Sequence, residues 1–337
     1  MYDFVDTEAR EQLRTRVAAL KRPSTYPGDV HCVEPIETHM SWVFLTERHA
    51  YKLKKPIRSS YFDYTTLEAR QRACQTEVEL NRRLAESVYL GVVSVTVNGT
   101  NRIWIDAEGK PIDWLVKMQR LPRRRMLDSC IERDDLEIDD IDRLAARLTR
   151  FYAAGEGAGF EKSEYRRAID TDIAAKGVSL KKPQYGLQHK SVDDAVGRLH
   201  QWVNEHRRLL ESRAGYTVDA HGDLRPEHVC LMDEPLVIDC LEFDRSLRLL
   251  DPVCELSFLA LECRRLGAAW IGDVLLSTYA ELSGDKPPNR LVCFYQGYHA
   301  LIRAAVALWH LDDDGVDEIE KWRRRGRWYV SEIRRLL

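Results

Sequence analysis

The sequence predicts an α+β fold of two lobes, with a small antiparallel sheet and one main helix in the N-lobe and a larger, mostly helical C-lobe. Strand patterns and turn residues are concentrated before residue 120, whereas apolar residues at helical spacing dominate after it. The change falls at Leu121 and Pro122. A chain of 337 residues is long enough to form two cores. We therefore expect an N-lobe at residues 1–120 and a C-lobe at residues 121–337.

The elements of the N-lobe follow from apolar spacing and from turn residues. Apolar residues at helical spacing among many charges predict helices over 6–21 and 66–86, and Pro23 ends the first of them. Two strand-like runs on either side of 47–49 predict a hairpin. Turn signals such as Asn98-Gly99 separate further strand-like runs. The expected strands are 41–46, 50–55, 92–97, 102–105 and 114–118.

The C-lobe is expected to consist of helices, with short strands only near residue 230. The helices are expected at about 139–154, 191–212, 252–266, 268–283, 290–310 and 315–336. The glycine-rich stretch 155–159 follows a helix rather than a strand, so we interpret it as the loop that ends this helix and not as a phosphate loop. The sequence contains no G-x-x-x-x-G-K-[ST] pattern, which excludes a P-loop nucleotide site.

Composition describes an ordinary globular protein. Hydrophobic residues make up 44% and charged residues 31%, and the net charge of −3 favours neither nucleic acid nor an anionic membrane as a partner. No uninterrupted apolar run approaches the roughly 18–20 residues of a membrane span, and the acidic start is unlike a signal peptide. The eight cysteines form no C-x-x-C pair, which favours buried thiols. The arginine runs 123–125 and 323–327 are interpreted as solvated faces. These features predict a cytoplasmic protein.

Two aspartates sixteen positions apart mark the centre of the C-lobe sequence. Asp223 stands two residues after His221, and Asp239 follows the apolar run 236–238. That run and 229–231 flank a turn and are predicted to form a hairpin. Kinases place a catalytic aspartate and a metal-binding aspartate in this way. The stretch therefore indicates a phosphotransferase.

The roles of the acidic residues follow from the needs of phosphoryl transfer, which are positioning and neutralisation of charge. An unperturbed aspartate, with a pKa of about 3.9, is ionised at neutral pH, and Asp223 is therefore the predicted base. Asp239 offers the hard oxygen that Mg²⁺ prefers and is the predicted metal ligand. Glu242, three residues later, is either a further carboxylate for metals or a surface residue of the turn.

His228 departs from the kinase pattern H-R-D-x-x-x-x-N, in which His221 and Asp223 fall in register. It occupies the position of the asparagine, which is a metal ligand in kinases. Imidazole suits softer metals than Mg²⁺. Three interpretations remain open: a single metal held chiefly by Asp239, a preference for Mn²⁺ with His228 as ligand, or nucleotide binding without efficient turnover.

A phosphate-binding lysine is expected on the strand 50–55, with a carboxylate on the helix 66–86 to hold it. Lys52 and Lys54 lie on the same face of the strand. The A-x-K sequence ending at Lys52 matches the kinase strand motif V-A-I-K and favours Lys52. Glu77 or Glu79 is the expected partner, and Glu77 is on the side that should face the strands. Lys55 is more simply explained as part of a solvated strand edge.

These motifs resemble the aminoglycoside phosphotransferase and choline kinase-like superfamily. The resemblance is carried by His-Gly-Asp-Leu at 221–224, by the polar residue at 228, by Ile238-Asp239 and by Leu-Asp-Pro at 250–252, which looks like the start of the next helix. More narrowly, the chain resembles a group of uncharacterised bacterial proteins of which some add a C-terminal P-loop domain. The stretches that match this group are 37–45, 50–56 and 238–243.

The resemblance covers residues of about 30 to 310 and implies a bilobal, protein kinase-like fold that binds ATP, with Asp223 as the base. It implies that the loop 38–41 covers the phosphates, although the loop has no glycine. The Ser41 hydroxyl or backbone N–H groups are the expected replacement for glycine. It also implies a hinge that contains Met118 and Arg120 and contacts adenine through its backbone.

The leading hypothesis is an ATP- and Mg²⁺-dependent phosphotransferase that acts on a hydroxyl of a small molecule. A nucleotide-binding pseudokinase with a regulatory role is the alternative from another class, and a kinase that acts on a protein is a third. Aminoglycosides are a weak candidate for the substrate, because the sequence does not place an acidic surface at the acceptor site. Neither nucleic acid nor a membrane is expected as a partner, and the sequence does not define the oligomeric state.

Overall fold

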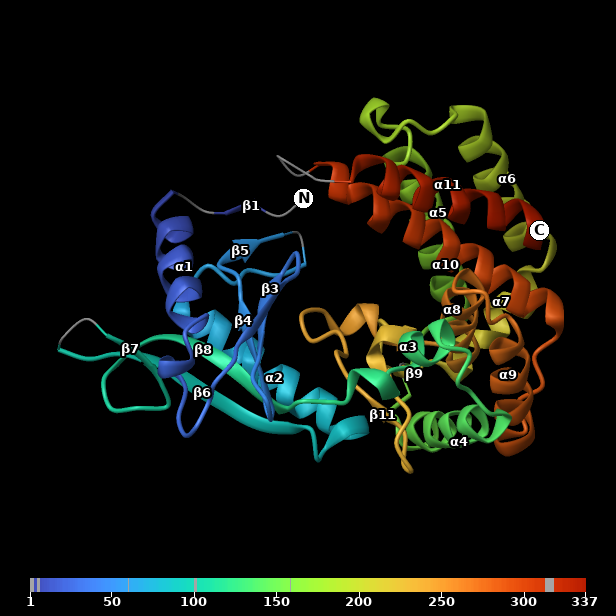
Figure 1. Cartoon of the computed structure of the whole chain (residues 1–337). Coiled ribbons are helices and arrows are strands. Elements are labelled where there is room, and N and C mark those ends of the chain that lie inside the picture. Colours follow the sequence, from blue (N-terminus) through green and yellow to red (C-terminus); the bar gives the residue numbers. More distant parts are fainter. Residues whose placement is uncertain (1–2, 5–6, 60, 100–101, 158, 313–317) are drawn as a thin grey trace. The chain divides into compact units, whose positions relative to one another are not determined.

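The computed structural model describes residues 3–4, 7–59, 61–99, 102–157, 159–312 and 318–337. The chain divides into two compact units (Figure 1). The N-terminal unit comprises the chain up to Met126 together with Leu236–Arg245, and the helical unit comprises Leu127–Pro235 and Ser246–Leu337. The sequence-based domains at 1–120 and 121–337 did not assign Leu236–Arg245 to the N-terminal part. Each unit is described by itself below.

The N-terminal unit contains a six-stranded antiparallel sheet in the order β2-β3-β4-β8-β6-β7. In the central part of the sheet, Lys52 lies opposite Val43 on one neighbouring strand and Val116 on the other. A second, two-stranded antiparallel sheet pairs β1 (Asp3–Phe4) with β5 (Ile57–Arg58). The six strands are β2 (Glu34–Glu37), β3 (Ser41–Leu45), β4 (His49–Lys54), β6 (Tyr89–Val97), β7 (Ile103–Ile105) and β8 (Lys110–Gln119).

Two helices pack on opposite faces of this sheet (Figure 1). Side chains alternate between the two faces of a strand, so neighbours along β4 enter different cores. Tyr51 and Leu53 belong to the core that includes residues of α1 (Thr7–Leu20). Ala50 belongs to the core that includes residues of α2 (Leu67–Ala85). The alternation therefore turns Lys52 and Lys54, in register with Ala50, toward α2.

A buried carboxylate connects both helices to β8. Asp113, which has no exposed surface, accepts hydrogen bonds from Arg16 of α1 (2.8 Å) and from Arg70 of α2 (2.7 Å). A buried charge is tolerated only where it is paired and hydrogen-bonded, and both conditions are met here. This network was not predicted, because the three residues are far apart in the sequence.

The helical unit contains the helices expected from the sequence and two more. The predicted helix at 191–212 is divided at His206 into two helices. Short antiparallel strands β9 (Val218–Asp219) and β12 (Leu249–Leu250) pair with each other, and β10 (Val229–Cys230) also lies in this unit. The helices are α3 (Leu127–Glu132), α4 (Ile138–Ala154), α5 (Lys162–Ser179), α6 (His189–Glu205), α7 (Arg207–Ser212), α8 (Pro252–Arg265), α9 (Trp270–Ser283), α10 (Asn289–Trp309) and α11 (Ile319–Leu336).

Helix α8 lies at the centre of this unit, and all of its residues from Pro252 to Cys263 are buried. It begins as the sequence predicts, because the Asp251 side chain accepts a hydrogen bond from the Val253 N–H (3.0 Å) at its N-terminus. Arg213 donates two hydrogen bonds of 2.7 Å to the same carboxylate. The start of α8 is thus fixed by a buried ion pair.

Helix α10 is long and largely apolar. By length and composition, Asn289–Asp312 is long and apolar enough to cross a membrane, but 72% of its apolar stretch is buried within the structure. A core helix that is apolar nearly all round has this composition.

The eight cysteines are free thiols, of which six are buried, Cys293 is half-buried and Cys32 is exposed.

Candidate active site

In the N-terminal unit, a buried carboxylate lies between two lysines of the same strand. Glu77 of α2 has no exposed surface and accepts hydrogen bonds from the Nζ atoms of Lys52 (2.9 Å) and Lys54 (2.6 Å), one on each oxygen. Lys52 Nζ also lies 2.5 Å from Asp239 Oδ1. Glu79, the other predicted partner, is exposed. The structure thus brings Lys52, Glu77 and Asp239 together.

Lys54 has a carboxylate of its own beyond the shared Glu77. Its Nζ donates to Glu242, which also accepts a hydrogen bond from the Tyr64 hydroxyl (2.8 Å). The interpretation of Glu242 as a surface residue of the turn was wrong, because only 7% of its side chain is exposed. The two lysines therefore form a continuous network with three carboxylates.

The segment Leu236–Arg245 is fixed in this unit by apolar contacts and by hydrogen bonds. Its first strand, β11 (Leu236–Val237), and Ile238 pack against the core of α2. The Asp239 N–H donates to the Tyr89 hydroxyl (3.0 Å), and the Cys240 N–H donates to Asn81 Oδ1 (2.9 Å). Asp239 has a φ of 63°, a left-handed conformation that aspartate adopts more readily than most residues. These contacts aim the Asp239 carboxylate at Lys52.

Opposite charges outweigh the effect of burial at Lys52 and Glu242. Burial by itself would lower the pKa of Lys52, but the charges of Asp239, Glu77 and Glu242 outweigh it and raise the pKa well above its ordinary value. Burial would raise the pKa of Glu242, but Lys54 and Lys52 hold that pKa below its ordinary value. The opposite charges around Lys52 and Glu242 thus favour the charged forms of these two groups.

The predicted phosphate-covering loop is a closed turn. The Ser41 N–H donates to Thr38 Oγ1 (3.0 Å), and the Thr38 N–H donates to the Ser41 carbonyl (2.9 Å). Ser41 is only 2% exposed. Its N–H is therefore already used within the turn.

The other predicted nucleotide contacts lie on β8 and just after it. Met118 is buried in the core beside α2. The Arg120 side chain donates to the Thr46 carbonyl (2.8 Å) and pairs with Glu34 (3.1 Å), and its backbone N–H donates to the Arg48 carbonyl. The contact of the hinge with adenine remains a prediction, and the Arg120 N–H is not available for it in this structure.

Lys55 is not on a solvated edge as expected, because it is buried and pairs with Glu37 (2.6 Å).

In the helical unit, a second buried carboxylate fixes the loop that carries Asp223. Glu255, in the first turn of α8, accepts hydrogen bonds from the N–H groups of His221 (3.0 Å) and Gly222 (2.6 Å). The Tyr152 hydroxyl donates to its other oxygen (2.8 Å). Gly222 has a φ of 87°, which favours glycine. Sequence reasoning missed Glu255, although its place three residues after Pro252 in the first turn of a helix was visible.

Asp223 and His228 are joined through Arg225. Arg225 Nε lies 3.0 Å from Asp223 Oδ2, and Arg225 Nη2 lies 2.8 Å from His228 Nε2. His228 Nδ1 lies 2.8 Å from the Asp223 carbonyl oxygen. Because a carbonyl only accepts and a guanidinium only donates, Nδ1 carries the proton and Nε2 accepts. Both ring nitrogens of His228 are therefore used within the loop, which is a poor fit to a metal ligand.

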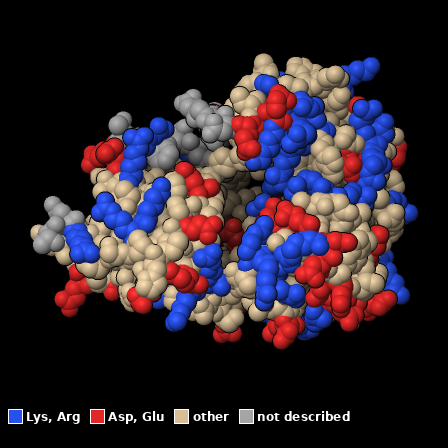
Figure 2. Space-filling view, in the orientation of Figure 1, with Lys and Arg blue, Asp and Glu red and all other residues tan. Residues whose placement is uncertain are grey.

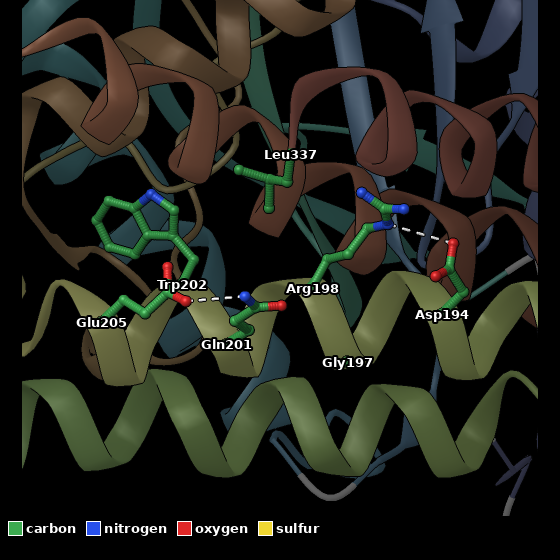
Figure 3. A pocket seen from close by; sticks show the side chains of 7 residues that line it. All are labelled: Asp194, Gly197, Arg198, Gln201, Trp202, Glu205 and Leu337. Carbon is green, nitrogen blue, oxygen red and sulfur yellow. Dashed lines mark hydrogen bonds and ion pairs between the residues drawn. The ribbon is translucent and has the colours of Figure 1, made fainter.

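Two further features of the described residues bear on a site, possible metal clusters and a surface hollow on α6. Among the residues that the structure describes, no group of three or more His, Cys, Asp and Glu side chains could hold a metal ion. A surface hollow of about 460 Å³ lies along α6 and includes Trp202 and Leu337 (Figure 3). No sequence-predicted site residue lines it. The chemistry-bearing residues are instead those of the lysine network and of the Asp223 loop.

Comparison with curated proteins finds uncharacterized relatives. The chain is 33% identical over 283 residues to uncharacterized proteins of Mycobacterium tuberculosis (strain ATCC 25618 / H37Rv) and Mycobacterium bovis. The match covers 80% of this chain and 53% of each relative, so the chain spans about half the length of the curated relatives it matches. No protein-family model matches the chain.

Comparison with solved structures finds small-molecule kinases. The GDP complex of wild-type aminoglycoside 2'-phosphotransferase-IIIa is similar at a TM-score of 0.58 and 14% identity, covering 96% of this chain and 98% of that one. Choline kinase from Cryptosporidium parvum is similar at a TM-score of 0.55 and 10% identity, and the match covers 96% of both chains. Glucosamine kinase in complex with glucosamine, ADP and inorganic phosphate is similar at a TM-score of 0.53 and 15% identity. This match covers 98% of this chain and 83% of that one. At these identities the likeness shows a common fold.

Proposed function

We propose that this chain, which has the protein kinase-like fold of the aminoglycoside phosphotransferases and choline kinases, transfers the γ-phosphate of ATP to a hydroxyl of a small-molecule acceptor. The expected fold and the resemblance to this superfamily are confirmed at the level of the fold. The observation that carries the proposal is the contact of Lys52 with both Glu77 and Asp239. Phosphoryl transfer needs a lysine held by a helix carboxylate and an acidic metal ligand nearby.

In the nucleotide half of the proposal, Lys52 binds the phosphates and Glu77 holds it in place. Asp239 suits Mg²⁺, because it offers hard carboxylate oxygens on a side chain that is 42% exposed. When bound, Mg²⁺ would neutralise charge on the phosphates. His228 does not fit the same role, since its ring nitrogens are engaged by Asp223 and Arg225.

In the acceptor half of the proposal, Asp223 accepts the proton of the attacking hydroxyl. Arg225 Nε lies 3.0 Å from its carboxylate and orients it. Glu255 fixes the backbone at His221 and Gly222 and so limits movement of the loop. A positioned base contributes a factor of about 10²–10⁴ to the rate.

The test is phosphorylation of a panel of hydroxylated metabolites with Mg·ATP, comparing the wild type with Asp223→Asn. We expect the substitution to lower kcat by about 10²–10⁴-fold while the Kd for ATP is unchanged. Asp233→Asn, at an exposed turn position, is the matched control and should retain full activity. The proposal fails if nucleotide binds but neither acceptor nor ATP turns over with Mg²⁺ or Mn²⁺.

A second candidate function is a nucleotide-binding pseudokinase with a regulatory role. It is favoured by His228, whose nitrogens are occupied where kinases present a metal ligand, and by the closed turn at Thr38–Ser41. Nucleotide binding that persists in a metal chelator, without any hydrolysis, would support this function over the first. A cytoplasmic location, where ATP is abundant, belongs to both proposals.

A further inference from the structure

Three arginines surround one buried glutamate in the helical unit. Glu262 of α8 has no exposed surface, and its carboxylate lies 2.9 Å from Arg265 Nε on the same helix. Arg303 of α10 and Arg325 of α11 lie 3.7 Å from it. The residues come from three different helices, so their convergence is a product of the fold. We call Arg265, Arg303 and Arg325 the arginine cluster.

The glutamate does not use the whole donor capacity of this cluster. Its two oxygens accept hydrogen bonds from the Tyr329 hydroxyl and from Arg265. Arg303 and Arg325 lie at ion-pair distance only, and their buried Nε atoms have no hydrogen-bond partner among the described residues. A guanidinium carries five N–H donors in a planar fork. Donors therefore remain for a further acceptor.

The charge of the cluster is not balanced. Three guanidinium groups face the carboxylate of Glu262, and the next carboxylate, that of Glu227, lies 3.9 Å from Arg265. Among the described residues within ion-pair distance, three positive charges stand against two negative charges, a surplus of one. The side chains are 12% exposed at Arg303 and 22% at Arg325, so the cluster is largely desolvated yet reachable from solvent. An unpaired charge in such a place is costly unless an anion accompanies it.

The cluster lies next to the loop that carries Asp223. Glu227 belongs to the short helical turn Pro226–His228, which begins three residues after Asp223. Helix α8 itself holds that loop through Glu255 at its other end. Burial lowers the pKa of Arg303, but the charges of Glu262 and, more weakly, Asp223 help to raise it above its ordinary value. Asp223 is thus close enough for its charge to act on Arg303.

The surface over α11 is basic as well. This helix carries seven Lys and Arg residues, and Figure 2 shows Lys and Arg gathered over the part of the helical unit where Figure 1 places α11. Arg325 was expected to lie on a solvated face. It is instead partly buried beside Glu262, which separates it from the exposed arginines of the same run, such as Arg327.

We propose that the arginine cluster binds an anionic group, a carboxylate or a phosphate, of the hydroxyl acceptor. The inference rests on the proposed function, since it assigns the acceptor to the same Asp223. Guanidinium forks match the planar oxygens of both groups and bind them with two parallel hydrogen bonds. A surplus of positive charge opposes a polycationic acceptor. The substrate class is therefore a hydroxylated acid or a sugar phosphate rather than an aminoglycoside.

The first arm of the test measures phosphorylation of four acceptors that share one sugar scaffold. Glucose is neutral, glucuronate carries a carboxylate, glucose 6-phosphate carries a phosphate and glucosamine carries a cation. Glycerol, glycerate and glycerol 3-phosphate form a smaller set of the same design. We expect kcat/KM for an anionic member to exceed that for its neutral counterpart by at least about tenfold, and the better anion distinguishes carboxylate from phosphate.

The second arm removes the arginines. Arg303→Gln and Arg325→Gln should each raise KM for the anionic acceptor by about 10–100-fold and leave KM for ATP unchanged. Arg303→Lys keeps the charge but loses the fork, so it should recover part of the affinity. Arg327→Gln is the matched control, because Arg327 is exposed on the same helix and pairs with Glu320. Thermal unfolding of each variant identifies any that fails to fold, and Arg325, the more exposed of the pair, then decides the test.

The third arm separates this inference from the proposed function. Calorimetric binding of glucuronate, glucose 6-phosphate and glucose is measured with Mg²⁺ and a saturating non-hydrolysable ATP analogue, which occupies the nucleotide site. Binding of an anion that Arg325→Gln abolishes supports the cluster even if no turnover is found. Preference for glucose or glucosamine, or anion binding that neither variant changes, overturns the inference while leaving phosphotransfer standing. Absence of anion binding to the wild type overturns it as well.

Discussion

Two charged clusters among the described residues have opposite composition. In the N-terminal unit, the ammonium groups of two lysines face the three carboxylates of Glu77, Asp239 and Glu242, which leaves a surplus of one negative charge. In the helical unit, the three guanidinium groups of the arginine cluster face Glu262 and Glu227, which leaves a surplus of one positive charge. Charges that exceed their partners in a partly buried site are costly, so each surplus favours a ligand of the opposite charge.

The two clusters share the cost of an unbalanced charge, but their different side chains indicate different ligands. Lysine is a compact charge that neutralises a carboxylate without fixing its geometry, and Asp239 remains 42% exposed beside it, so a hard cation can approach. Arginine offers a rigid fork, and the cluster keeps donors that no described residue uses. The first cluster suits a metal–nucleotide complex, and the second suits an anionic acceptor. The predictions below test this contrast.

The largest effect is expected at Glu77, the carboxylate that both lysines share. Glu77→Gln leaves Lys52 and Lys54 buried with one charge fewer between them. Removing one partner of a buried ion pair costs about 3–5 kcal/mol, so the free energy of unfolding should fall by this amount. Chemical denaturation measures it. Glu79→Gln, on the exposed side of the same helix, is the control and should be nearly neutral.

If Glu77→Gln had the same free energy of unfolding as the wild type, the two lysines would not need the shared carboxylate to remain buried. That result would contradict the description of the N-terminal cluster as a network held together by Glu77.

The next effect separates the two lysines by role. Lys52 contacts Asp239, so Lys52→Met should lower kcat/KM for ATP by about 10²-fold with a smaller loss of stability. Lys54 contacts the buried Glu242 instead, so Lys54→Met should lower the free energy of unfolding by about 3 kcal/mol. Steady-state kinetics and thermal unfolding of both variants measure the two effects. The reverse assignment, with Lys54→Met as the catalytic defect, would show that Lys54 binds the phosphates.

Local patterns in the sequence predicted the elements around these sites. Alternation along 50–55 gave the shared face of Lys52 and Lys54, and helical spacing over 66–86 turned Glu77 toward the sheet. The edge strand β2 was missed because Glu34–Glu37 is exposed throughout and has no apolar alternation. Helix α5 was missed because its buried stripe, Tyr165, Ile169, Ile173 and Gly177, is narrow and includes a glycine.

Convergence of distant residues could not be predicted. Glu255 reaches the Asp223 loop across more than thirty residues of sequence, and Arg303 meets Arg325 only because α10 and α11 pack together. A run of arginines has the same sequence pattern whether it is solvated or buried, so 323–327 gave no sign of Arg325. Lys55 was misjudged for the related reason that its partner, Glu37, lies on the missed strand.

A pH effect follows from the burial of His299 beside the arginine cluster. Burial, followed by the charge of Arg303, lowers the pKa of His299 to about 3 from an ordinary 6.5, against opposing contributions from Glu262 and Asp223. The unfolded state then binds more protons than the folded state between these values, so stability falls as the pH falls below 6.5. The free energy of unfolding should drop by about 2 kcal/mol between pH 7 and pH 5 from this residue alone.

Thermal unfolding at several pH values measures this effect. His299→Gln should flatten the pH dependence in this interval, whereas His189→Gln, at an exposed position of α6, should leave it unchanged. Equal slopes in His299→Gln and the wild type would mean that folding does not lower the pKa of His299.

The smallest effect is expected at His228, and it sharpens the assignment of the metal site to the negative cluster. His228 uses Nδ1 to donate to the Asp223 carbonyl and Nε2 to accept from Arg225, so it supports the loop and presents no lone pair to a metal. His228→Gln should therefore change the ratio of activity with Mg²⁺ to activity with Mn²⁺ by no more than about threefold, whereas loss of a true ligand changes metal dependence by about 10–100-fold or more. Asp239→Asn provides that comparison, since the proposal makes Asp239 the ligand.

Metal titrations of activity in the two variants measure both effects. A large change of metal preference in His228→Gln would show that the histidine leaves Arg225 when the metal binds, and that the Asp223 loop contributes a ligand to the metal.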